Sequence, residues 1–521
     1  MFPFPSQPLL DLPELLEKVF HYLDRSDLTR CAQVNKQWHA LIIPHLWSNI
    51  ACVCTNYETR EAFVRIVLED YLQENGHGKG PSQPSALSKY GHLIRLLPSP
   101  LDLERALQSQ ARTRQGTAHD LLLHLFKRSS NAKVQSLRYE FKDPELDHMK
   151  SILAFILPRV RRLFIQASNQ GTQSEFSMVK SILDQCSTTL ESLDVDINAL
   201  RVYKADDKDE SICWTSLKDL TLRHDRGSWD AGPVWSWMCR RCSQVERLYV
   251  RMIDQSTPSL VQAMLAYMHN LREITVGDHS QRTFYGYPDD EMKDDVIAAL
   301  LSGSRRGWKG VSVRATAKLG RATMNALAMH YSTLQEFYID GHPDHLSSDL
   351  VQVLRSCPHL HTLRYTHWRS GISAVDSEVF ADMDPITGSL KPWLCEGSLK
   401  MLEIKIARIP RPDLKKDDVD EEAYPGQGRE IQSQVYGRLG RLTHLEKLRL
   451  SDVTSTPRSD CLEMTLESGL DKLSGLKSLQ ELNVGSMETN IGTKEIQWMV
   501  ENWPKLGVIH GVNGRAKDWR R

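Results

Sequence analysis

Residues 186–193 read CSTTLESL, residues 242–248 read CSQVERL, and residues 357–363 read CPHLHTL. In each stretch a cysteine precedes an apolar residue by three or four positions, and a second apolar residue follows after two variable positions. A third apolar residue comes two positions later, and this alternation is typical of a short strand with one buried face. The stretch therefore predicts a strand that recurs along the chain.

The same unit is found from residue 134 onward. Its first six copies begin at residues 134, 160, 190, 217, 245 and 271, so the spacing is 26 to 30 residues. Helical patterns fill the intervals, for example at Leu260, Met264 and Met268. The apolar positions of the copies are Val134-Leu137-Tyr139, Val160-Leu163-Ile165, Leu190-Leu193-Val195, Leu217-Leu220-Leu222, Val245-Leu248-Val250, Leu271-Ile274-Val276, Trp308-Val311-Val313, Leu334-Phe337-Ile339, Leu360-Leu363-Tyr365, Leu399-Leu402-Ile404, Leu445-Leu448-Leu450 and Leu479-Leu482-Val484, with Leu506 and Ile509 as a degenerate last copy.

These copies resemble the cysteine-containing leucine-rich repeats, whose period is about 20–29 residues. The resemblance implies an α/β solenoid with a parallel sheet on its concave side and helices on its convex side. Asn198 matches the asparagine expected after the strand, whereas most copies lack it. We place the repeats at residues 131–521, and the longer intervals predict insertions near residues 278–300, 366–392 and 405–440.

The N-terminal segment has a different pattern. A helix is predicted by apolar residues at helical spacing, namely Leu12, Leu15, Leu16, Val19, Phe20 and Leu23. A second helix is expected to begin at Ser26 and Asp27 and to extend to Ile42, and Pro44 is expected to begin a last short element. Three short helices in about 40 residues lie near the lower size limit for independent stability, so we expect this segment to need a partner.

This segment resembles the F-box family, which is commonly joined to leucine-rich repeats. The family's motifs occur in order as Leu12-Pro13-Glu14-Leu15-Leu16, Asp27-Leu28, Val34-Asn35-Lys36-Gln37-Trp38 and Leu46-Trp47, and Asn35 departs from the cysteine often found there. The resemblance implies an F-box helical bundle at residues 8–50 that binds the Skp-type adaptor, and through it the cullin, of Skp–cullin–F-box ubiquitin ligases. The adaptor-binding residues it implies are Leu12, Pro13, Leu16, Val19, Leu23 and Leu28. The alternative is that such residues form the private core of a small helical domain, and we expect this for Trp38.

Residues 51–130 are expected to form a helical connector between the F-box and the repeats. Helices are predicted from Leu93 to Leu97 and from Ala118 to Phe126. Residues 75–85 are rich in Gly, Pro and Ser and predict a flexible loop.

The composition limits the classes of partner and compartment. The formal net charge is −1, which offers no general reason to expect nucleic-acid or membrane binding. The apolar stretches are far shorter than the roughly 20 residues of a membrane-spanning helix, and the first residues lack the charged start of a secretory signal. We therefore expect a cytoplasmic or nuclear protein.

The sequence contains no catalytic motif that rises above background. Cys239 and Cys242 form a lone Cys-x-x-Cys, and because no second pair of ligands has zinc spacing, we expect two structural thiols. We expect no cofactor, no metal site and no active site of the chain's own.

Residues beside the apolar strand positions are expected on the concave face, because strand side chains alternate. The predicted substrate-binding residues are Arg223, Arg247, Tyr249, Arg251, Arg314, Tyr338 and Arg364, with Lys405 and Arg449 on the same face. Arg and Tyr are enriched at interface hot spots, and arginines bind acidic or phosphorylated peptides. The alternative left open is that they pair with carboxylates of the same face, namely Asp194, Glu273, Glu336 and Asp340.

These patterns and resemblances favour a substrate receptor of a ubiquitin ligase, in which the F-box holds the adaptor and the concave face binds an unknown protein substrate. A scaffold that recruits the adaptor without ligase function is the alternative. An enzyme is the least favoured class.

Overall fold

The structure is a computed structural model of the 521-residue chain. The residues that it describes are 13–48, 57–75, 85–94, 96–97, 118–129, 133–134, 136–140, 153, 156–166, 173–200, 213–223, 232–251, 257–277, 292–314, 319–340, 347–366, 374–409, 427–450, 461–485 and 491–511. Residues 76–84 of the predicted loop at 75–85 and most of the connector after residue 97 lie outside this set. No helix in the described ranges is both long enough and apolar enough to cross a membrane.

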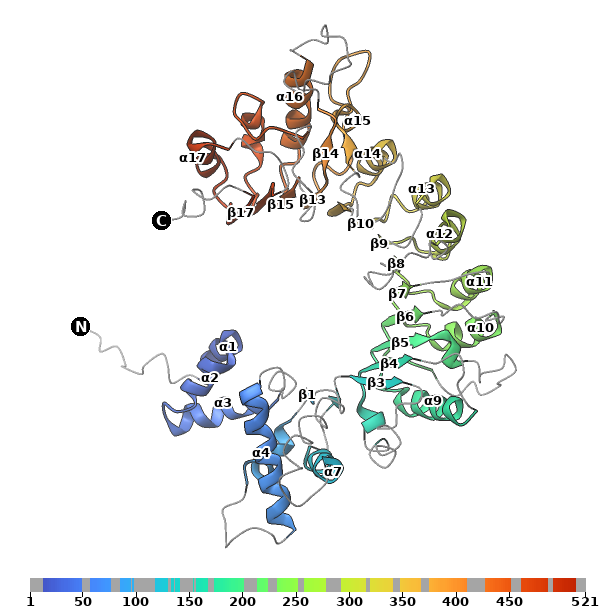
Figure 1. The fold of residues 1–521 in the computed structure, drawn as a ribbon, viewed down its shortest axis with the longest axis vertical. Coiled ribbons are helices and arrows are strands. Elements are labelled where there is room, and N and C mark those ends of the chain that lie inside the picture. Colours follow the sequence, from blue (N-terminus) through green and yellow to red (C-terminus); the bar gives the residue numbers. More distant parts are fainter. Residues whose placement is uncertain are drawn as a thin grey trace, which may run out of the picture. The chain divides into compact units, whose positions relative to one another are not determined.

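The main element of the described residues is a parallel sheet of 13 strands in chain order (Figure 1). Each strand contains the middle apolar position of one copy of the repeated unit, including the degenerate last copy, so the predicted α/β repeat fold is confirmed. The strands are β3 (Leu137–Glu140), β4 (Arg162–Gln166), β5 (Ser192–Asp196), β6 (Asp219–Arg223), β7 (Arg247–Val250), β8 (Glu273–Val276), β9 (Gly310–Val313), β10 (Glu336–Asp340), β11 (Thr362–Thr366), β13 (Met401–Glu403), β15 (Lys447–Arg449), β16 (Glu481–Asn483) and β17 (Val508–His510).

The chain divides into two compact units, Met1–Leu220 and Thr221–Arg521. In the second unit the middle apolar residue of each repeat lies beside its equivalent in the next strand. This register runs through Leu248, Ile274, Val311, Phe337, Leu363, Leu402, Leu448, Leu482 and Ile509. The first eight of these side chains are at most 1 % exposed, so the repeats share one continuous apolar ladder.

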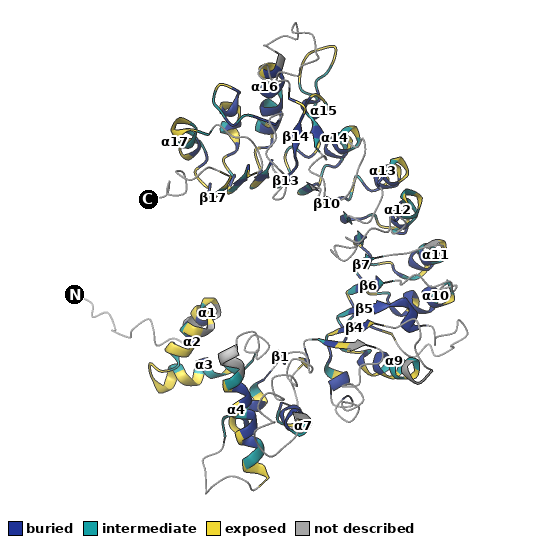
Figure 2. Ribbon diagram, in the orientation of Figure 1, coloured by how far each residue is buried: buried dark blue, intermediate teal, exposed yellow. Residues whose placement is uncertain are grey.

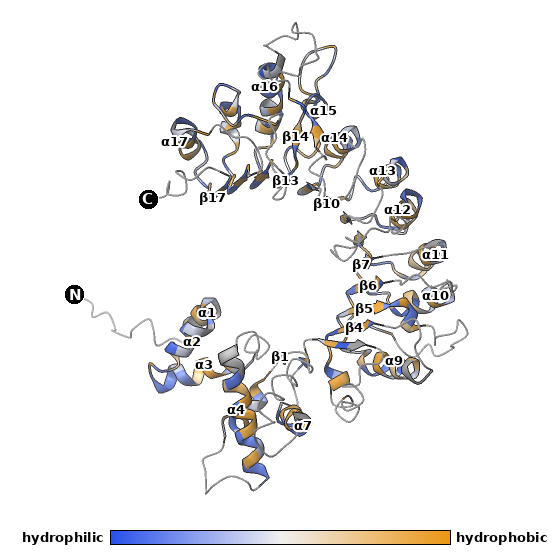
Figure 3. Ribbon diagram, in the orientation of Figure 1, coloured by the Kyte–Doolittle hydropathy of each residue, from blue (hydrophilic) through white to orange (hydrophobic). Residues whose placement is uncertain are grey.

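Helices of the second unit lie on one side of its strands (Figure 1). Buried residues line the strands in Figure 2, and α17 has both hydrophobic and hydrophilic faces in Figure 3, as an amphipathic helix against a core does. We call the opposite side of the sheet the open face. The helices are α10 (Gly232–Arg241), α11 (Thr257–Tyr267), α12 (Asp294–Leu301), α13 (Arg321–Ala328), α14 (Ser347–Ser356), α15 (Ser377–Ala381), α16 (Gln427–Gly440) and α17 (Thr493–Asn502).

The first unit begins with three helices, α1 (Pro13–Tyr22), α2 (Arg25–Cys31) and α3 (Lys36–Ser48). The predicted second helix was wrong in its extent, because it ends at Cys31 and a new helix begins at Lys36. Asn35 causes this restart, since its Oδ1 accepts a hydrogen bond from the Trp38 N–H at 2.8 Å and caps α3. Pro44 lies inside α3 rather than at the start of another element.

The connector contains α4 (Tyr57–Glu74), α5 (Ala86–Tyr90) and α7 (Ala118–Arg128), and α9 (Gln173–Cys186) packs beside the first repeats. The helix predicted from Ala118 is confirmed, whereas the one from Leu93 to Leu97 is wrong. Leu96 and Leu97 form the short strand β1 (Leu96–Leu97), which pairs with β2 (Lys133–Val134). Pro98 follows, and the residue before a proline favours an extended conformation.

An irregular segment of the second unit, residues 374–396, lies largely within the predicted insertion at residues 366–392. It includes β12 (Val375–Asp376), which pairs with β14 (Ile406–Ala407), and the helix α15. Helix α12 lies partly within the insertion predicted at 278–300, and α16 lies within the one predicted at 405–440, so both also supply helices that cover the sheet.

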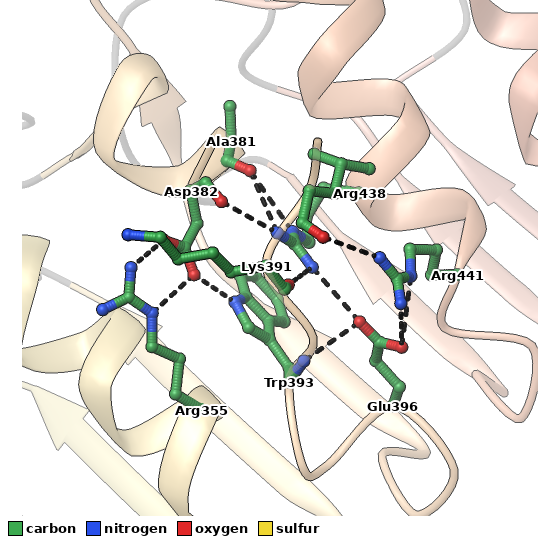
Figure 4. A network of polar contacts seen from close by, with 9 residues as sticks. Arg355, Ala381, Asp382, Lys391, Trp393, Glu396, Arg438 and Arg441 are labelled. Carbon is green, nitrogen blue, oxygen red and sulfur yellow. Dashed lines mark hydrogen bonds and ion pairs between the residues drawn. The ribbon is translucent and has the colours of Figure 1, made fainter. Parts of the chain in front are cut away.

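A buried arginine of α16 holds this irregular segment (Figure 4). The Arg438 side chain is 0 % exposed and pairs with Glu396 at 3.1 Å. Its guanidinium also donates hydrogen bonds to the backbone carbonyls of Ala381, Asp382 and Lys391. Burial lowers the pKa of Arg438 to about 10, so the group is still charged at neutral pH.

Trp393 and Asp382 complete the network around this guanidinium. The guanidinium carbon of Arg438 lies 4.5 Å from the centre of the Trp393 ring, and the indole N–H donates to Asp382 at 2.9 Å. Arg355 of α14 donates from Nε to the same carboxylate at 2.6 Å. Asp382 itself has a left-handed backbone with φ 54°, so its carboxylate contacts stabilise a sharp turn after α15.

Candidate functional site

The three N-terminal helices enclose a small apolar core. Leu16, Phe20, Leu28 and Ile42 are buried together. The predicted core position of Trp38 is confirmed, because it packs on this cluster with its ring centre 5.5 Å from that of Phe20. The described part of this core is small, so much of the stabilisation of these helices is expected from a partner surface.

The predicted adaptor-binding residues fall into different environments. Leu16 and Leu28 are buried in the core and Leu23 packs against it, so these side chains support the helices from inside. Val19 is 52 % exposed on α1. Leu12 lies outside the described residues, and Pro13 is the first residue of α1. Adaptor binding by these six residues stays a prediction.

Two exposed apolar residues, Tyr22 of α1 and Val34 of the turn between α2 and α3, were missing from the predicted set. Tyr22 is 86 % exposed and Val34 is 61 % exposed. Tyr22 follows Val19 by three positions on α1, which is the spacing of one helix face. That spacing was a usable signal in the sequence, but only the fold shows that the face around Val19 stays at the surface.

The predicted substrate-binding residues lie in or directly after strands of the second unit. Tyr249, Tyr338 and Arg364 lie between two buried apolar residues of their strands, so they face away from the helices, on the open face. Arg247 begins β7, and Arg223 ends β6. The structure therefore places these side chains on one face, although substrate binding by them stays a prediction.

Part of this face is internally paired. Arg364 lies with its guanidinium carbon 5.6 Å from the Tyr338 ring centre and pairs with Glu403 at 2.6 Å. Arg449 of β15, the strand beside that of Glu403, pairs with Glu403 at 3.5 Å and with Glu481 at 2.7 Å. Arg364 is therefore paired with a carboxylate of its own face, which is the alternative that the sequence left open. The carboxylate is Glu403, which was not among those named from the sequence.

Tyr338 shows how polar this part of the face is. Burial and the neighbouring carboxylate of Glu336 raise the pKa of Tyr338 to about 12. Its hydroxyl donates a hydrogen bond to Glu336 at 3.0 Å. Tyr338 is therefore neutral and committed to a neighbour at physiological pH.

Lys405 is a correction to the sequence interpretation. It is 4 % exposed, and its backbone carbonyl accepts a hydrogen bond from the Val375 N–H of β12 at 2.7 Å, so it has left the main sheet. Glu403 has the position in β13 that Arg364 has in β11 and Arg449 has in β15, because the three residues are lateral neighbours in the sheet. The strand β13 is only three residues long, and the alternation of side chains does not continue beyond it.

Cys239 and Cys242 are both buried within the first repeat helix of the second unit and the turn that follows it. Burial raises the pKa of the Cys239 thiol to about 12, which keeps it protonated and unreactive. Within the described ranges, no group of three or more His, Cys, Asp or Glu side chains is placed to hold a metal ion.

Comparison with known families agrees with the architecture of the N-terminal helices. The F-box-like family model matches residues 9–53, so the chain contains an F-box-like domain there. The chain is also similar to a chain of the Rad7 and Elc1 complex from yeast, with 12 % identity, a TM-score of 0.38, and coverage of 87 % of this chain and 93 % of that one. The comparison with curated proteins finds no match.

Proposed function

We propose that the chain is the substrate-recognition subunit of a Skp–cullin–F-box ubiquitin ligase in the cytoplasm or nucleus. The F-box-like helices bind a Skp-type adaptor, and the open face of the repeats binds a protein substrate. Ubiquitin transfer is carried out by other subunits, and this chain contributes by tethering, which raises the effective concentration of the substrate.

The F-box-like match at residues 9–53 carries this proposal. It is supported by the exposed apolar side chains of Val19 and Tyr22 on α1 and of Val34 in the turn between α2 and α3, in a segment whose own core is small. Exposed apolar groups of this size on a minimal helical unit are typical of a protein-binding surface. In this arrangement Leu16 and Leu28 also hold the helices together, and Val19 is the exposed member of the predicted set that we test.

Co-purification with a Skp-type adaptor tests the first half of the proposal. Val19→Lys places a charge in the apolar interface, so we expect the retained adaptor to fall at least tenfold. Val500→Lys is the matched control, because Val500 is also an exposed helical valine, at 47 % against 52 % for Val19. Equal retention by wild type and Val19→Lys would contradict adaptor binding through this surface.

Substrate accumulation separates the receptor from a scaffold. A receptor's bound protein accumulates when the receptor is depleted, whereas a scaffold's partner keeps its level. The measurement is the abundance and half-life of proteins that co-purify with the chain in a cullin-containing complex. Unchanged half-lives of all of them would contradict the ligase function while leaving adaptor binding intact.

A further inference from the structure

The last strand of the sheet, β17, has a neighbour on one side only. It pairs with β16 in parallel, and the described residues contain no strand on its other side. Figure 1 shows β17 at the end of the row of strands. An open strand edge exposes unpaired backbone N–H and C=O groups, which can pair with another chain.

The repeats of the second unit share a backbone contact that shows how a strand is added to this sheet. The carbonyl of the residue just before a strand accepts hydrogen bonds from two consecutive N–H groups of the following repeat. Gln480, for example, accepts from Gly507 at 2.7 Å and from Val508 at 3.1 Å. The same contact is made by the carbonyls of Glu246, Arg272, Lys309, Gln335, His361, Lys400 and Glu446.

Gly507 has the equivalent position before β17, and among the described residues no backbone N–H donates to its carbonyl. The Val508 N–H and the His510 C=O both bond to β16. Backbone groups alternate in direction along a strand, so those of Ile509 point to the open side. The edge therefore presents the carbonyls of Gly507 and Ile509 and the N–H of Ile509, at the spacing that a parallel strand requires.

The apolar ladder is also incomplete at this edge. Leu448 and Leu482 are fully buried, each between two lateral neighbours. Ile509 continues the ladder but is only half-buried, and Val508 beside it is 44 % exposed. A further strand with an apolar residue beside Ile509 would complete the ladder and remove this surface from water.

The strand β17 lacks the side chains that usually protect an edge. Natural edges are blunted by charged residues, by proline or by a bulge. The sequence of β17 is Val508-Ile509-His510, with two β-branched residues and no proline, lysine or acidic residue. The strand is short, but β13, β15 and β16 have the same length and still pair on both sides.

We propose that this edge binds an extended peptide segment of a partner protein, which adds to β17 as a further parallel strand. The central residue of the segment is apolar and lies beside Ile509, and the residue before it is apolar or β-branched and lies beside Val508. Backbone hydrogen bonds supply the affinity in this mode of recognition, and alternate side chains supply the specificity. The inference goes beyond the proposed function, because it uses the edge of the sheet and not the F-box-like helices or the open face.

A parallel segment fits this edge better than a second copy of the chain does. The strands of the main sheet in the second unit pair in the parallel direction, and the recurring carbonyl contact belongs to that direction. Two copies related by a two-fold axis would bring their β17 strands together antiparallel.

The experiment measures the binding of a fluorescent heptapeptide pool to the full chain by anisotropy. Positions 3 and 4 of the pool are valine and isoleucine, which we expect beside Val508 and Ile509, and the other positions are degenerate. A pool with aspartate at position 4 should bind at least tenfold more weakly, because a charge then replaces the apolar residue of the ladder.

Backbone N-methylation of the peptide tests the direction of the added strand. In a parallel addition the N–H groups of positions 3 and 5 point to β17, and that of position 4 points away. N-methylation at positions 3 and 5 should therefore weaken binding at least tenfold, whereas N-methylation at position 4 should change it less than twofold. The reverse result would mean antiparallel addition and would overturn the inference.

On the chain, Ile509→Pro removes the N–H that points to the open side. Proline is tolerated in an edge strand at such a position, because no hydrogen bond within the sheet is lost. We expect this variant to bind the pool at least tenfold more weakly. Ile509→Val is the matched control, since it keeps the N–H and has a side chain of about the size of the proline ring, and its binding should stay within threefold of wild type. Unchanged hydrogen exchange at β15 shows that Ile509→Pro is folded.

The inference is overturned if the full chain does not bind the pool, or if Ile509→Pro binds it as tightly as Ile509→Val does. It is also overturned if sedimentation shows a dimer that Ile509→Pro dissociates, since a second copy then occupies the edge. Adaptor co-purification and substrate half-lives do not depend on this edge, so each of these results leaves the proposed function standing.

Discussion

The regular repeats and the irregular segment of residues 374–396 are held by different contacts, although both belong to the second unit. Apolar residues in register join the regular repeats, as Phe337 and Leu363 do across β10 and β11. A buried charge holds the irregular segment against α16, because Arg438 of this helix binds Glu396 and several backbone carbonyls of the segment.

The difference follows from the length of the chain between strands. A constant period stacks apolar residues on their equivalents and leaves few polar groups to satisfy. The longer interval after β11 adds the short helix α15, whose last carbonyl groups have no partner within the helix. Arg438 donates to two of these, at Ala381 and Asp382, and so satisfies groups that an apolar side chain would leave unpaired.

Removal of the central charge is expected to have the largest effect. Arg438→Met removes the buried charge that pairs with Glu396 and the donor to the carbonyls of Ala381 and Asp382, so we expect a loss of about 3–5 kcal/mol in the free energy of local opening. Native-state hydrogen exchange of residues 374–409 measures it. Arg441→Met is the control, because Arg441 binds the same Glu396 from a side chain that is 38 % exposed, and its loss should stay below about 1 kcal/mol. Equal losses in the two variants would contradict a special role for the buried arginine.

A cavity in the apolar ladder should have the next largest effect. Leu363→Ala removes a fully buried side chain between Phe337 and Leu402, and we expect it to cost about 3 kcal/mol. Because each repeat contacts only its neighbours, faster hydrogen exchange should be confined to the repeats around β11. Exchange that rises equally at β7 would show that the ladder opens as one cooperative block.

A polar contact between two regular repeats should have the smallest effect. Asp294 of α12 accepts hydrogen bonds from the backbone N–H groups of Gly320, Ala322 and Thr323 at 2.8 to 2.9 Å, and so caps the start of α13. Asp294→Asn should therefore cost about 1 kcal/mol. The control is Asp295→Asn, which changes the exposed neighbour on the same helix.

The same contact predicts a pH dependence. Burial by itself raises the pKa of Asp294, but the hydrogen bonds from Thr323, Ala322 and Gly320 outweigh it and hold the pKa below the ordinary 3.8. A carboxyl with a lowered folded-state pKa stabilises the fold above its ordinary pKa and loses this contribution as the pH falls through the folded-state value. The stability difference between wild type and Asp294→Asn should thus be full at pH 6 and shrink below pH 4. A difference that is constant from pH 6 to pH 3 would contradict the charged cap.

Most of the fold could be predicted because its signals are local. Each strand has its own copy of the unit, and a weak copy such as Leu506 and Ile509 is still recognised by its distance from the previous one. Predictions failed where one side chain or one long-range pairing decided the structure. Asn35 ends one helix and caps the next, and Leu96 becomes a strand because Lys133 pairs with it.

The candidate sites were less predictable than the fold. Apolar spacing identified Leu16 and Val19 together, since both lie on one helix, but only packing decided that Leu16 is inside and Val19 outside. Strand alternation placed Arg364 on the open face but could not name Glu403 as its partner, because the partner lies 39 residues away in a strand that ends before Lys405.

The sequence by itself determined the period, the strand in each repeat, the F-box-like segment and the arginine-rich composition of one face, because all of these are written in residues close together in the chain. The tertiary structure decided which arginines are paired with carboxylates and which one is buried. The physical reason is that lateral neighbours in a parallel sheet are separated by 26 to 46 residues of chain, so the environment of each charge depends on the register of strands and not on its own sequence context.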